Sequence, residues 1–258
     1  MNKTENRAVL LFTLDPGKER KSGIPGKRRL SNFLWSVIRD VIESVHELGD
    51  TQLFITVGEE GGAFQKRIES LTQGFAYWSR QPVFIPLSGN HFETNLKDSV
   101  QTIIERKFSQ VAVVANDSPF CDTSVFRKTF DLLDRGRGAV LGPSRDGGLY
   151  LLGFRAGVDC LDGIPWKSAK VFQAIRNCLA VSGFSFECLP IQMDIDRFSD
   201  LHLVRRFFHN LRSHFQNLII KLLEIFTRVF YAPPVSNSNT EVWFRLIFQK
   251  SPPFSFSK

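Results

Sequence analysis

Acidic side chains at two places in the chain have the type and spacing of a metal and phosphate site. Asp117 follows the apolar run VAVVA directly, in the stretch NDSPF, and Asp194 and Asp196 occupy alternate positions in DIDRFSD. Magnesium and manganese prefer oxygen ligands, and they usually take one or two carboxylates together with substrate phosphate oxygens. An extended backbone at 194–196 would put both carboxylates on one side, where a cation relieves their repulsion. Each of these two stretches is therefore a candidate to bind Mg²⁺ or Mn²⁺.

Each acidic signal also has a purely structural explanation when it is considered alone. Asp117 would serve as the cap of a helix that starts near Thr123, because aspartate is common in turns and at helix starts. The stretch GPSRDGG at 142–148 lies between two apolar runs and contains Asp146 beside two glycines. Such glycines suit a ligand that lies against the main chain, whereas a DG step between strands is also a hairpin signal. Both interpretations of each stretch stay open at this point.

A basic, glycine-containing loop, DPGKERKSGIPGKRR at 15–29, is the third candidate. Gly17 and Gly26 allow the backbone to approach a ligand closely, and the start of the following helix adds its dipole. Positive charge comes from Lys18, Lys21, Lys27, Arg28 and Arg29. Neither GxxxxGK[ST] nor GxGxxG is present. The loop suits a polyphosphate, and a solvated basic loop is the alternative.

Alternating strand and helix patterns position these candidates. The first helix is expected to start at a Ser31 cap and to end before Gly49. The other expected elements are strands at 8–14, 52–57, 83–85, 111–115, 139–141, 149–154 and 186–189, and helices at 63–71, 95–107 and 168–181. This alternation implies right-handed crossovers and a mainly parallel α/β sheet that is covered on both faces. Ligands bind such sheets at the carboxyl ends of the strands, which is where Asp117 falls.

The bulk composition favours one main domain in the cytoplasm. A chain of 258 residues with 43% hydrophobic content can bury one substantial core. It contains no run of about 18 uncharged apolar residues, and its first residues are polar, so we expect neither a membrane span nor secretion. The four cysteines form no CxxC pair and have no histidine partner at zinc spacing, which indicates reduced, structural cysteines.

The net charge of +7 is concentrated at the carboxyl-terminal end. Residues 201–258 carry eight Lys or Arg against two Asp or Glu, and no nucleic-acid-binding signature accompanies them, so we expect no specific nucleic acid as partner. Residues 205–230 show apolar side chains at helical spacing with basic residues elsewhere. This amphipathic helix fits docking on the main domain or on a second subunit, or peripheral attachment to an anionic membrane. Residues 231–258 are rich in Pro, Ser and Asn, which is typical of weak order.

The order of these features resembles one family, the DUF2064 group of glycosyltransferase-A-like transferases, also described as radical-SAM-associated or selenodomain-associated transferases. The matching words are NDSPF at 116–120, VLGPSRDGGLYLLGF at 140–154, IPWKSAKVF at 164–172 and DIDRFSDL at 194–201. The resemblance predicts a transferase domain over residues 1–204, followed by the helix and the tail. The same fold is shared with the guanylyltransferases of molybdenum-cofactor and deazaflavin-cofactor synthesis. This chain departs from the family pattern at Ala115, at Leu149 and in the shortened word PGKRRL.

The resemblance implies a three-layer α/β/α glycosyltransferase-A-like fold, with a mainly parallel mixed sheet, that binds a nucleotide or nucleotide-sugar and a divalent metal. It assigns the metal to Asp117, Asp194 and Asp196. Catalytic roles fall on Asp117, Asp146 and Lys27, and ligand contacts on Gly17, Lys18, Gly26, Arg29, Gly147, Gly148 and Ser168. The expected reaction is glycosyl transfer from a nucleotide-sugar. Nucleotidyl transfer from an NTP to a phosphorylated acceptor needs the same carboxylates, and a non-catalytic homologue is the third alternative.

Overall fold

The computed structural model describes residues 6–17, 27–58, 60–75, 78, 80–89 and 91–193. Four residues of the predicted site lie outside these ranges, namely Lys18, Gly26, Asp194 and Asp196. The predicted helix at 205–230, the tail at 231–258 and the domain end at 204 lie outside them as well. These expectations therefore stay predictions.

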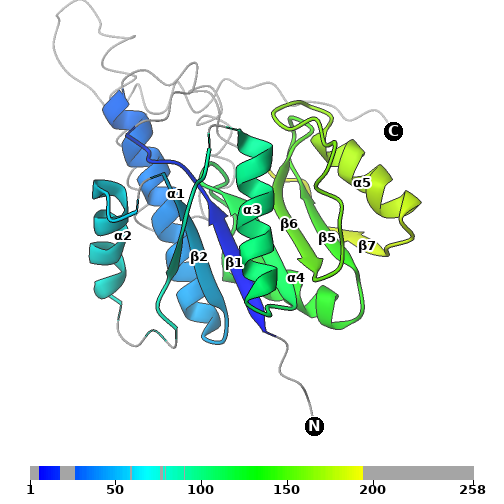
Figure 1. The fold of residues 1–258 in the computed structure, drawn as a ribbon, viewed down its shortest axis with the longest axis horizontal. Coiled ribbons are helices and arrows are strands. Elements are labelled where there is room, and N and C mark those ends of the chain that lie inside the picture. The colour runs from blue at the N-terminus through cyan, green and yellow to red at the C-terminus, as the bar shows by residue number, and fades with distance from the viewer. Residues whose placement is uncertain are drawn as a thin grey trace, which may run out of the picture. The chain divides into compact units, whose positions relative to one another are not determined.

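Within the described part of the chain, seven strands form one sheet in the order β3-β2-β1-β4-β6-β5-β7 (Figure 1). The strands are β1 Arg7–Phe12, β2 Gln52–Val57, β3 Val83–Pro86, β4 Gln110–Ala115, β5 Ala139–Pro143, β6 Leu149–Arg155 and β7 Phe186–Cys188. Each pairing is parallel except those of β6, which runs antiparallel to both β4 and β5. The predicted mainly parallel mixed sheet is confirmed.

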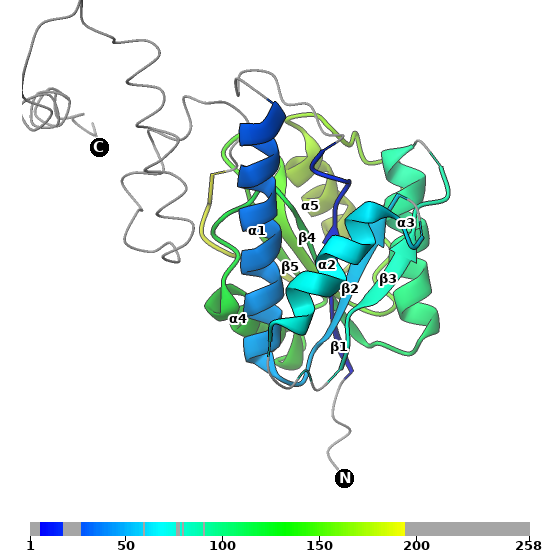
Figure 2. The same cartoon turned by 90° about the vertical axis from the view of Figure 1, so that its left-hand side faces the viewer.

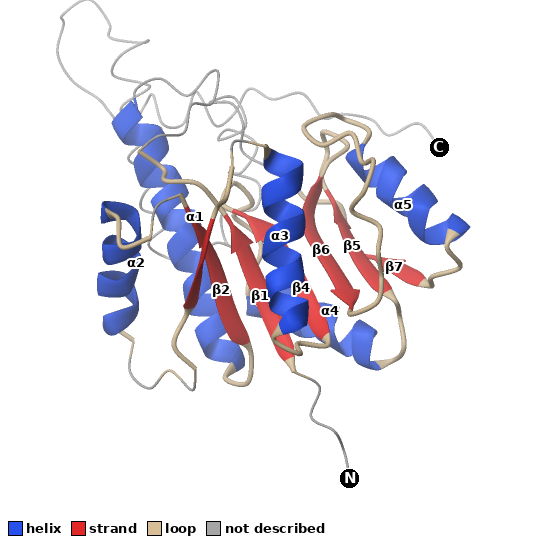
Figure 3. Cartoon of the chain, viewed as in Figure 1, coloured by secondary structure: helices blue, strands red, loops and turns tan. Residues whose placement is uncertain are grey.

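Helices cover both faces of the sheet, which gives three layers (Figures 2 and 3). The helices are α1 Lys27–Leu48, α2 Ala63–Gln73, α3 Phe92–Glu105, α4 Thr123–Asp134 and α5 Val171–Val181. One buried cluster joins α1, α2 and α4 to one face of the sheet, and a second joins α3 and α5 to the other. The predicted α/β/α architecture is confirmed. None of the helices among the described residues is long and apolar enough to cross a membrane.

The central strands are apolar along their whole length because helices cover them from both sides. Every residue of β2 is buried, as are the five residues of β1 from Ala8 to Phe12. The helix α1 buries one stripe, as its helical period predicts. Its buried apolar residues are Phe33, Leu34, Val37, Ile38, Val41, Ile42 and Val45. This packing fixes the ends of the central strands, from which the candidate residues project.

The helix α1 starts earlier than predicted. It begins at Lys27 rather than after a cap at Ser31, and it ends at Leu48 as expected before Gly49. Lysine, arginine and leucine are among the best helix formers, so the word KRRL extends the helix towards its amino end. The prediction of a Ser31 cap is therefore wrong. As a consequence, Lys27 and Arg29 belong to the first turn of α1 and not to the preceding loop.

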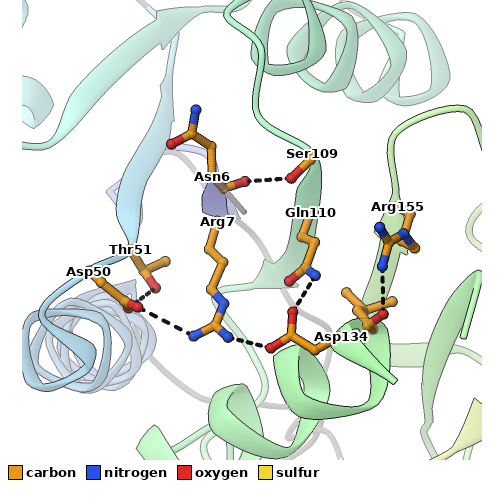
Figure 4. A network of polar contacts seen from close by, with 9 residues as sticks. Asn6, Arg7, Asp50, Thr51, Ser109, Gln110, Asp134 and Arg155 are labelled. Carbon is orange, nitrogen blue, oxygen red and sulfur yellow. Dashed lines mark hydrogen bonds and ion pairs between the residues drawn. The ribbon is translucent and has the colours of Figure 1, made fainter. Parts of the chain in front are cut away.

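A polar network joins the elements at the amino-terminal edge of β1 and β4 (Figure 4). Arg7, at the start of β1, pairs through Nη2 with Asp134 Oδ2 at 2.5 Å and through Nη1 with Asp50 Oδ2 at 3.4 Å. Gln110, at the start of β4, donates from Nε2 to Asp134 Oδ1 at 2.7 Å. Ligands of open α/β sheets bind at the opposite, carboxyl edge. We therefore assign this network to structure rather than to chemistry.

The carboxyl ends of β1 and β4 lie side by side, since Phe12 pairs with Ala115. Within the sheet, β2 and β3 lie on one side of β1, and β4 lies on the other side of β1. The strand order reverses at this point, and such a topological switch point leaves a crevice for ligands in open α/β sheets. The segments 13–17 and 116–122, which follow the two strands, border this position.

Candidate functional site

Asp117 lies in the turn that follows β4, at the topological switch point. Its neighbours Asn116 and Ser118 are buried, with 6% and 2% of their surfaces exposed, whereas Asp117 itself is only partly buried. The Ser118 hydroxyl donates to Asp117 Oδ1 at 3.4 Å. The turn is therefore held by buried residues on both sides, while the carboxylate between them keeps contact with solvent.

The cap of α4 is Asp122 and not Asp117. Asp122 Oδ1 accepts hydrogen bonds from the backbone N–H groups of Ser124 at 2.9 Å and of Val125 at 3.0 Å. An N-cap residue immediately precedes the first helical residue, which is Thr123 here. The alternative in which Asp117 caps this helix is wrong. Helix capping therefore does not explain why an aspartate occupies position 117.

Replacing Asp122 with alanine is expected to lower the free energy of unfolding by about 1 kcal/mol, because two backbone donors lose their acceptor. Urea denaturation followed by circular dichroism measures this loss. Asp131→Ala is the matched control, since Asp131 is an exposed carboxylate inside the same helix. A loss at Asp122 no larger than the loss at Asp131 would contradict the capping role.

Reciprocal hydrogen bonds fix the chain where it leaves β1. The Thr13 N–H donates to Thr56 Oγ1 at 2.7 Å, and the Thr56 hydroxyl donates back to the Thr13 carbonyl oxygen at 2.7 Å. Thr56 is fully buried in β2. Two residues further on, Asp15 Oδ1 accepts from the Gly17 N–H at 2.8 Å. These bonds set the direction in which the basic loop starts, and they place Gly17 next to the switch point.

The stretch 142–148 forms the turn between the antiparallel strands β5 and β6, so its interpretation as a hairpin is confirmed. The Ser144 N–H donates to the Gly148 carbonyl oxygen at 3.1 Å, and the Gly147 N–H donates to the Ser144 carbonyl oxygen at 3.1 Å. Asp146 Oδ1 accepts from the Gly148 N–H at 2.9 Å and from the Ser144 hydroxyl. Asp146 is exposed, and one of its oxygens stabilises the turn itself. A ligand role for Asp146 stays a prediction.

This turn lies at the same edge of the sheet as Asp117. The strand β6 starts at Leu149, and Val114 near the end of β4 pairs with Leu151. The turn before β6 and the turn after β4 are therefore neighbours. The structure thus brings two of the predicted carboxylates, Asp117 and Asp146, to one edge of the sheet.

Gly147 is in close contact with the segment that precedes α5. Its φ angle is +89°, and a Cβ atom added to it would lie 2.1 Å from the carbonyl oxygen of Ala169. The Phe172 N–H donates to the Gly147 carbonyl oxygen at 3.0 Å. A side chain at this position would meet both the unfavourable φ angle and the neighbouring backbone. The glycine is required for the contact between the two segments.

Ser168 lies in the same segment and stabilises its fold. Its hydroxyl donates to the Pro165 carbonyl oxygen at 2.6 Å and accepts from the Lys170 N–H at 3.2 Å. The adjacent Lys167 has a φ angle of +65°, which is uncommon for a residue with a side chain. Ser168 is exposed at this position. Its predicted contact with an acceptor therefore involves a hydroxyl that is already part of a turn.

The chain returns to this edge before the second acidic pair. The Gln192 N–H donates to the Pro143 carbonyl oxygen, and the Arg145 N–H donates to the Gln192 carbonyl oxygen, both at 3.0 Å. The described chain ends at Met193, which directly precedes Asp194 in the sequence. Periodicity did not predict this pairing of 191–193 with the β5–β6 turn.

A pocket of about 420 Å³ lies beside the site, between α1, the start of α4 and the segment 191–193. Arg145 of the β5–β6 turn lines it, whereas Asp117 and Asp146 do not. The pocket is on the face that α1 and α4 cover. Sequence reasoning did not single out its walls, because they come from elements far apart in the chain.

No group of three or more His, Cys, Asp or Glu side chains gathers into a metal-binding set among the residues that the structure describes. Two of the three predicted ligands, Asp194 and Asp196, follow Met193 and lie outside those residues. Asp117 is the remaining ligand. The predicted basic residues Lys27 and Arg29 lie in the first turn of α1. Of the three predicted metal ligands, only Asp117 therefore lies among the described residues.

Residues 43–168 match the family model described as "Uncharacterized protein conserved in bacteria (DUF2064)". This match includes Asp117, the β5–β6 turn and Ser168, and it confirms the resemblance to that family over this part of the chain. No curated protein sequence matches the chain.

Solved structures share the fold. One, from Desulfovibrio desulfuricans G20 and provisionally named a nucleotide-diphospho-sugar transferase, is 20% identical, covers 86% of this chain and 98% of its own, and has a TM-score of 0.70. A 4-diphosphocytidyl-2C-methyl-D-erythritol synthase is 9% identical, covers 78% of this chain and 98% of its own, and has a TM-score of 0.51. At these identities the likeness establishes the three-layer fold.

Proposed function

We propose that this chain is a metal-dependent transferase that takes a glycosyl group from a nucleotide-sugar. The observation that carries the proposal is the position of Asp117. It lies at the topological switch point between β1 and β4, where open α/β sheets bind their ligands, and it does not cap the following helix. A partly exposed carboxylate at that point suits a metal–phosphate complex.

The comparisons support a nucleotide as substrate. The family match includes both Asp117 and Asp146. The Desulfovibrio protein with the same fold carries the name of a nucleotide-diphospho-sugar transferase. Together with the basic loop after β1, this likeness favours a diphosphate-containing donor over an uncharged ligand.

A divalent cation fits the donor chemistry of this edge. Asp117 offers carboxylate oxygens, and hard cations complete their coordination with phosphate oxygens and water. Asp194 and Asp196 are proposed as further ligands, since the pairing of Gln192 with the β5–β6 turn leads the chain to this edge directly before them. A bound cation would neutralise the diphosphate that leaves the sugar.

The chain's own contribution to the reaction is binding, positioning and charge. The amino terminus of α1 carries the positive end of its dipole, and Lys27 and Arg29 add charge within its first turn. Gly17, Lys18 and Gly26 would let the loop backbone approach the diphosphate. These groups stabilise the negative charge that develops on the leaving group, which is electrostatic rather than covalent catalysis.

The β5–β6 turn and the segment before α5 would form the other side of the site. Gly147 and Gly148 let a ligand lie against the main chain, and Asp146 is proposed to act on the reacting sugar or its acceptor. Ser168 would contact a phosphate or carboxylate of the acceptor. Because Gly147 packs on Ala169, the β5–β6 turn and the segment that carries Ser168 are held in one fixed arrangement.

Nucleotidyl transfer is the second candidate, and the shared fold of the 4-diphosphocytidyl-2C-methyl-D-erythritol synthase favours it. In that reaction a phosphorylated acceptor attacks the α-phosphate of an NTP. The same carboxylates and the same cation would serve both reactions. The two candidates therefore differ in the ligand that they bind and not in the position of the site.

A thermal-shift panel of the full chain separates these candidates. NTPs and nucleotide-diphospho-sugars are each added with Mg²⁺, with Mn²⁺ or with EDTA. A ligand at about 100 times its Kd adds about 2.7 kcal/mol of stability, which raises the Tm by about 5 to 10 °C in a domain of this size. We expect the largest increase for nucleotide-sugars, and only in the presence of the metal.

Each outcome of the panel has a definite meaning. A larger shift with NTPs than with nucleotide-sugars would replace glycosyl transfer by nucleotidyl transfer. Equal shifts with and without EDTA would overturn metal dependence. A flat response to every nucleotide would overturn both reactions and leave the non-catalytic homologue.

A further inference from the structure

Two cysteines from different segments are in contact on the face of the sheet that α5 covers. Cys160 lies in the segment between β6 and α5, and Cys178 lies in α5 itself. Their Sγ atoms are 2.6 Å apart, which is closer than the van der Waals contact of two sulfur atoms. Cys160 is buried, with 5% of its surface exposed, whereas Cys178 is only half-buried. Both are free thiols in this structure.

We propose that Cys160 and Cys178 form a reversible disulfide, which makes this pair a modification site that does not depend on the proposed transferase activity. A disulfide needs its two cysteines to be placed so that the sulfurs meet without backbone movement. The fold already provides this arrangement. The surrounding core residues Ile175 and Leu179 are almost fully buried and hold α5 against the sheet.

The environment of the two sulfurs sets the order of the steps. Burial, followed by the close contact with Cys178, raises the pKa of Cys160 to about 12, so this thiol is protonated at neutral pH. The more exposed Cys178 is therefore the sulfur that first meets an oxidant. The oxidant is a low-molecular-weight disulfide, RSSR, such as oxidised glutathione.

The exchange then proceeds in two balanced steps. Cys178 gives up its proton to solvent, and its sulfur attacks one sulfur of RSSR, breaks the S–S bond and releases one RS⁻, which leaves a mixed disulfide on Cys178. Cys160 gives up its proton to solvent and attacks the Cys178 sulfur, which expels the second RS⁻. Two protein thiols are oxidised to one disulfide, and one RSSR is reduced to two RSH.

The bond would close a loop that contains part of the candidate site. Residues between Cys160 and Cys178 include Ser168 and Ala169, whose carbonyl oxygen packs against Gly147. Trp166 in the same loop packs on the ring of Phe92 at 5.5 Å between centroids. A cross-link at the ends of this loop limits the conformations of the segment that carries Ser168.

Redox titration of the purified full chain tests the proposal. The protein is equilibrated with glutathione buffers of graded potential, quenched, and examined by intact mass and by peptide mapping. We expect wild type to lose two hydrogen atoms in mass and two of its four titratable thiols, with the bond mapped between Cys160 and Cys178. Cys160→Ser and Cys178→Ser should each prevent this bond.

Cys188→Ser is the matched control, because Cys188 is exposed and lies outside the pair. This variant should form the bond as wild type does. Retention of all four thiols at every potential, a glutathione adduct as the final product, or a bond that includes Cys188 would each overturn the proposal.

Stability gives a second readout that does not require any variant to fold. Closing the loop reduces the conformational entropy of the unfolded chain, so the oxidised wild-type protein should melt about 5 °C or more above the reduced protein. Dithiothreitol should reverse this shift. An oxidised protein that melts at or below the temperature of the reduced one would contradict a disulfide compatible with the native fold.

Discussion

Asp117→Asn is expected to abolish the metal-dependent increase in Tm that a nucleotide gives, and to lower kcat/KM by at least about 100-fold. The substitution keeps the size of the side chain and its contact with Ser118, and it removes the negative charge at the switch point. A neutral amide is a weaker ligand for a hard cation, and loss of one electrostatic group at such a site typically costs 10²- to 10³-fold, by order of magnitude. Thermal shift with nucleotide and Mg²⁺ measures binding, and turnover of the ligand found by the panel measures activity.

Asp131→Asn is the control for Asp117→Asn. It makes the same chemical change at an exposed position of α4, away from the switch point, and it should leave both readouts unchanged. The melting temperature of the Asp117→Asn protein without ligand should also stay close to that of wild type. If the Asp117→Asn protein showed metal-dependent stabilisation equal to that of wild type, Asp117 would be removed from the site.

Gly147→Ala is expected to lower the free energy of unfolding by about 3 kcal/mol. The new Cβ would lie 2.1 Å from the carbonyl oxygen of Ala169 and 2.8 Å from its carbonyl carbon, distances that force the backbone to move. The φ angle of +89° adds backbone strain. The close contact and the backbone strain each cost about 1 to 3 kcal/mol. The movement also threatens the hydrogen bond from Phe172 to Gly147. Urea denaturation measures the loss.

Gly136→Ala separates the two contributions. Gly136 has nearly the same φ angle, +87°, but a Cβ atom there would meet nothing within 4 Å. It should therefore lose only about 1 kcal/mol, which is the cost of the backbone conformation alone. Equal losses in the two variants would show that the contact between Gly147 and Ala169 contributes nothing to stability.

Local patterns predicted the elements of this fold well, because hydrophobic periodicity reports directly which side of an element is buried. The run VAVVA became a strand that is mostly buried, β4, and the stripe from Phe33 to Val45 became the buried side of α1. The start of α1 was missed because a serine before an apolar stripe looks like a cap. The helix-forming residues before it decided the outcome instead.

Local sequence patterns do not predict the order of the strands or the contacts between distant segments. The pairing of Gln192 with the β5–β6 turn joins residues about fifty positions apart, and no periodicity in either segment carries that information. The contact between Cys160 and Cys178 is similar, since their spacing matches no motif. The cap at Asp122, in contrast, could be predicted from the sequence, because an aspartate directly before the first helical residue, Thr123, is a preferred N-cap.

For the candidate site, the sequence supplied candidate carboxylates, and their ligand roles stay predictions. The pairings of β4 and β5 with β6 place Asp117 and Asp146 at one edge of the sheet, which the motifs alone did not predict. The metal set that includes Asp194 and Asp196, the basic loop at Lys18 and Gly26, and the membrane or docking role of 205–230 lie outside the described residues and stay predictions.

The close approach of Gly147 to Ala169 has a consequence for protein engineering. The word GPSRDGG is not a self-contained loop, because the backbone of its second-last glycine rests on a segment more than twenty residues further along the chain. A graft of this turn onto another scaffold must therefore carry residues 168–172 with it. A chimera that exchanges the turn between relatives needs both segments from the same parent, since precise sites depend on the residues that support them.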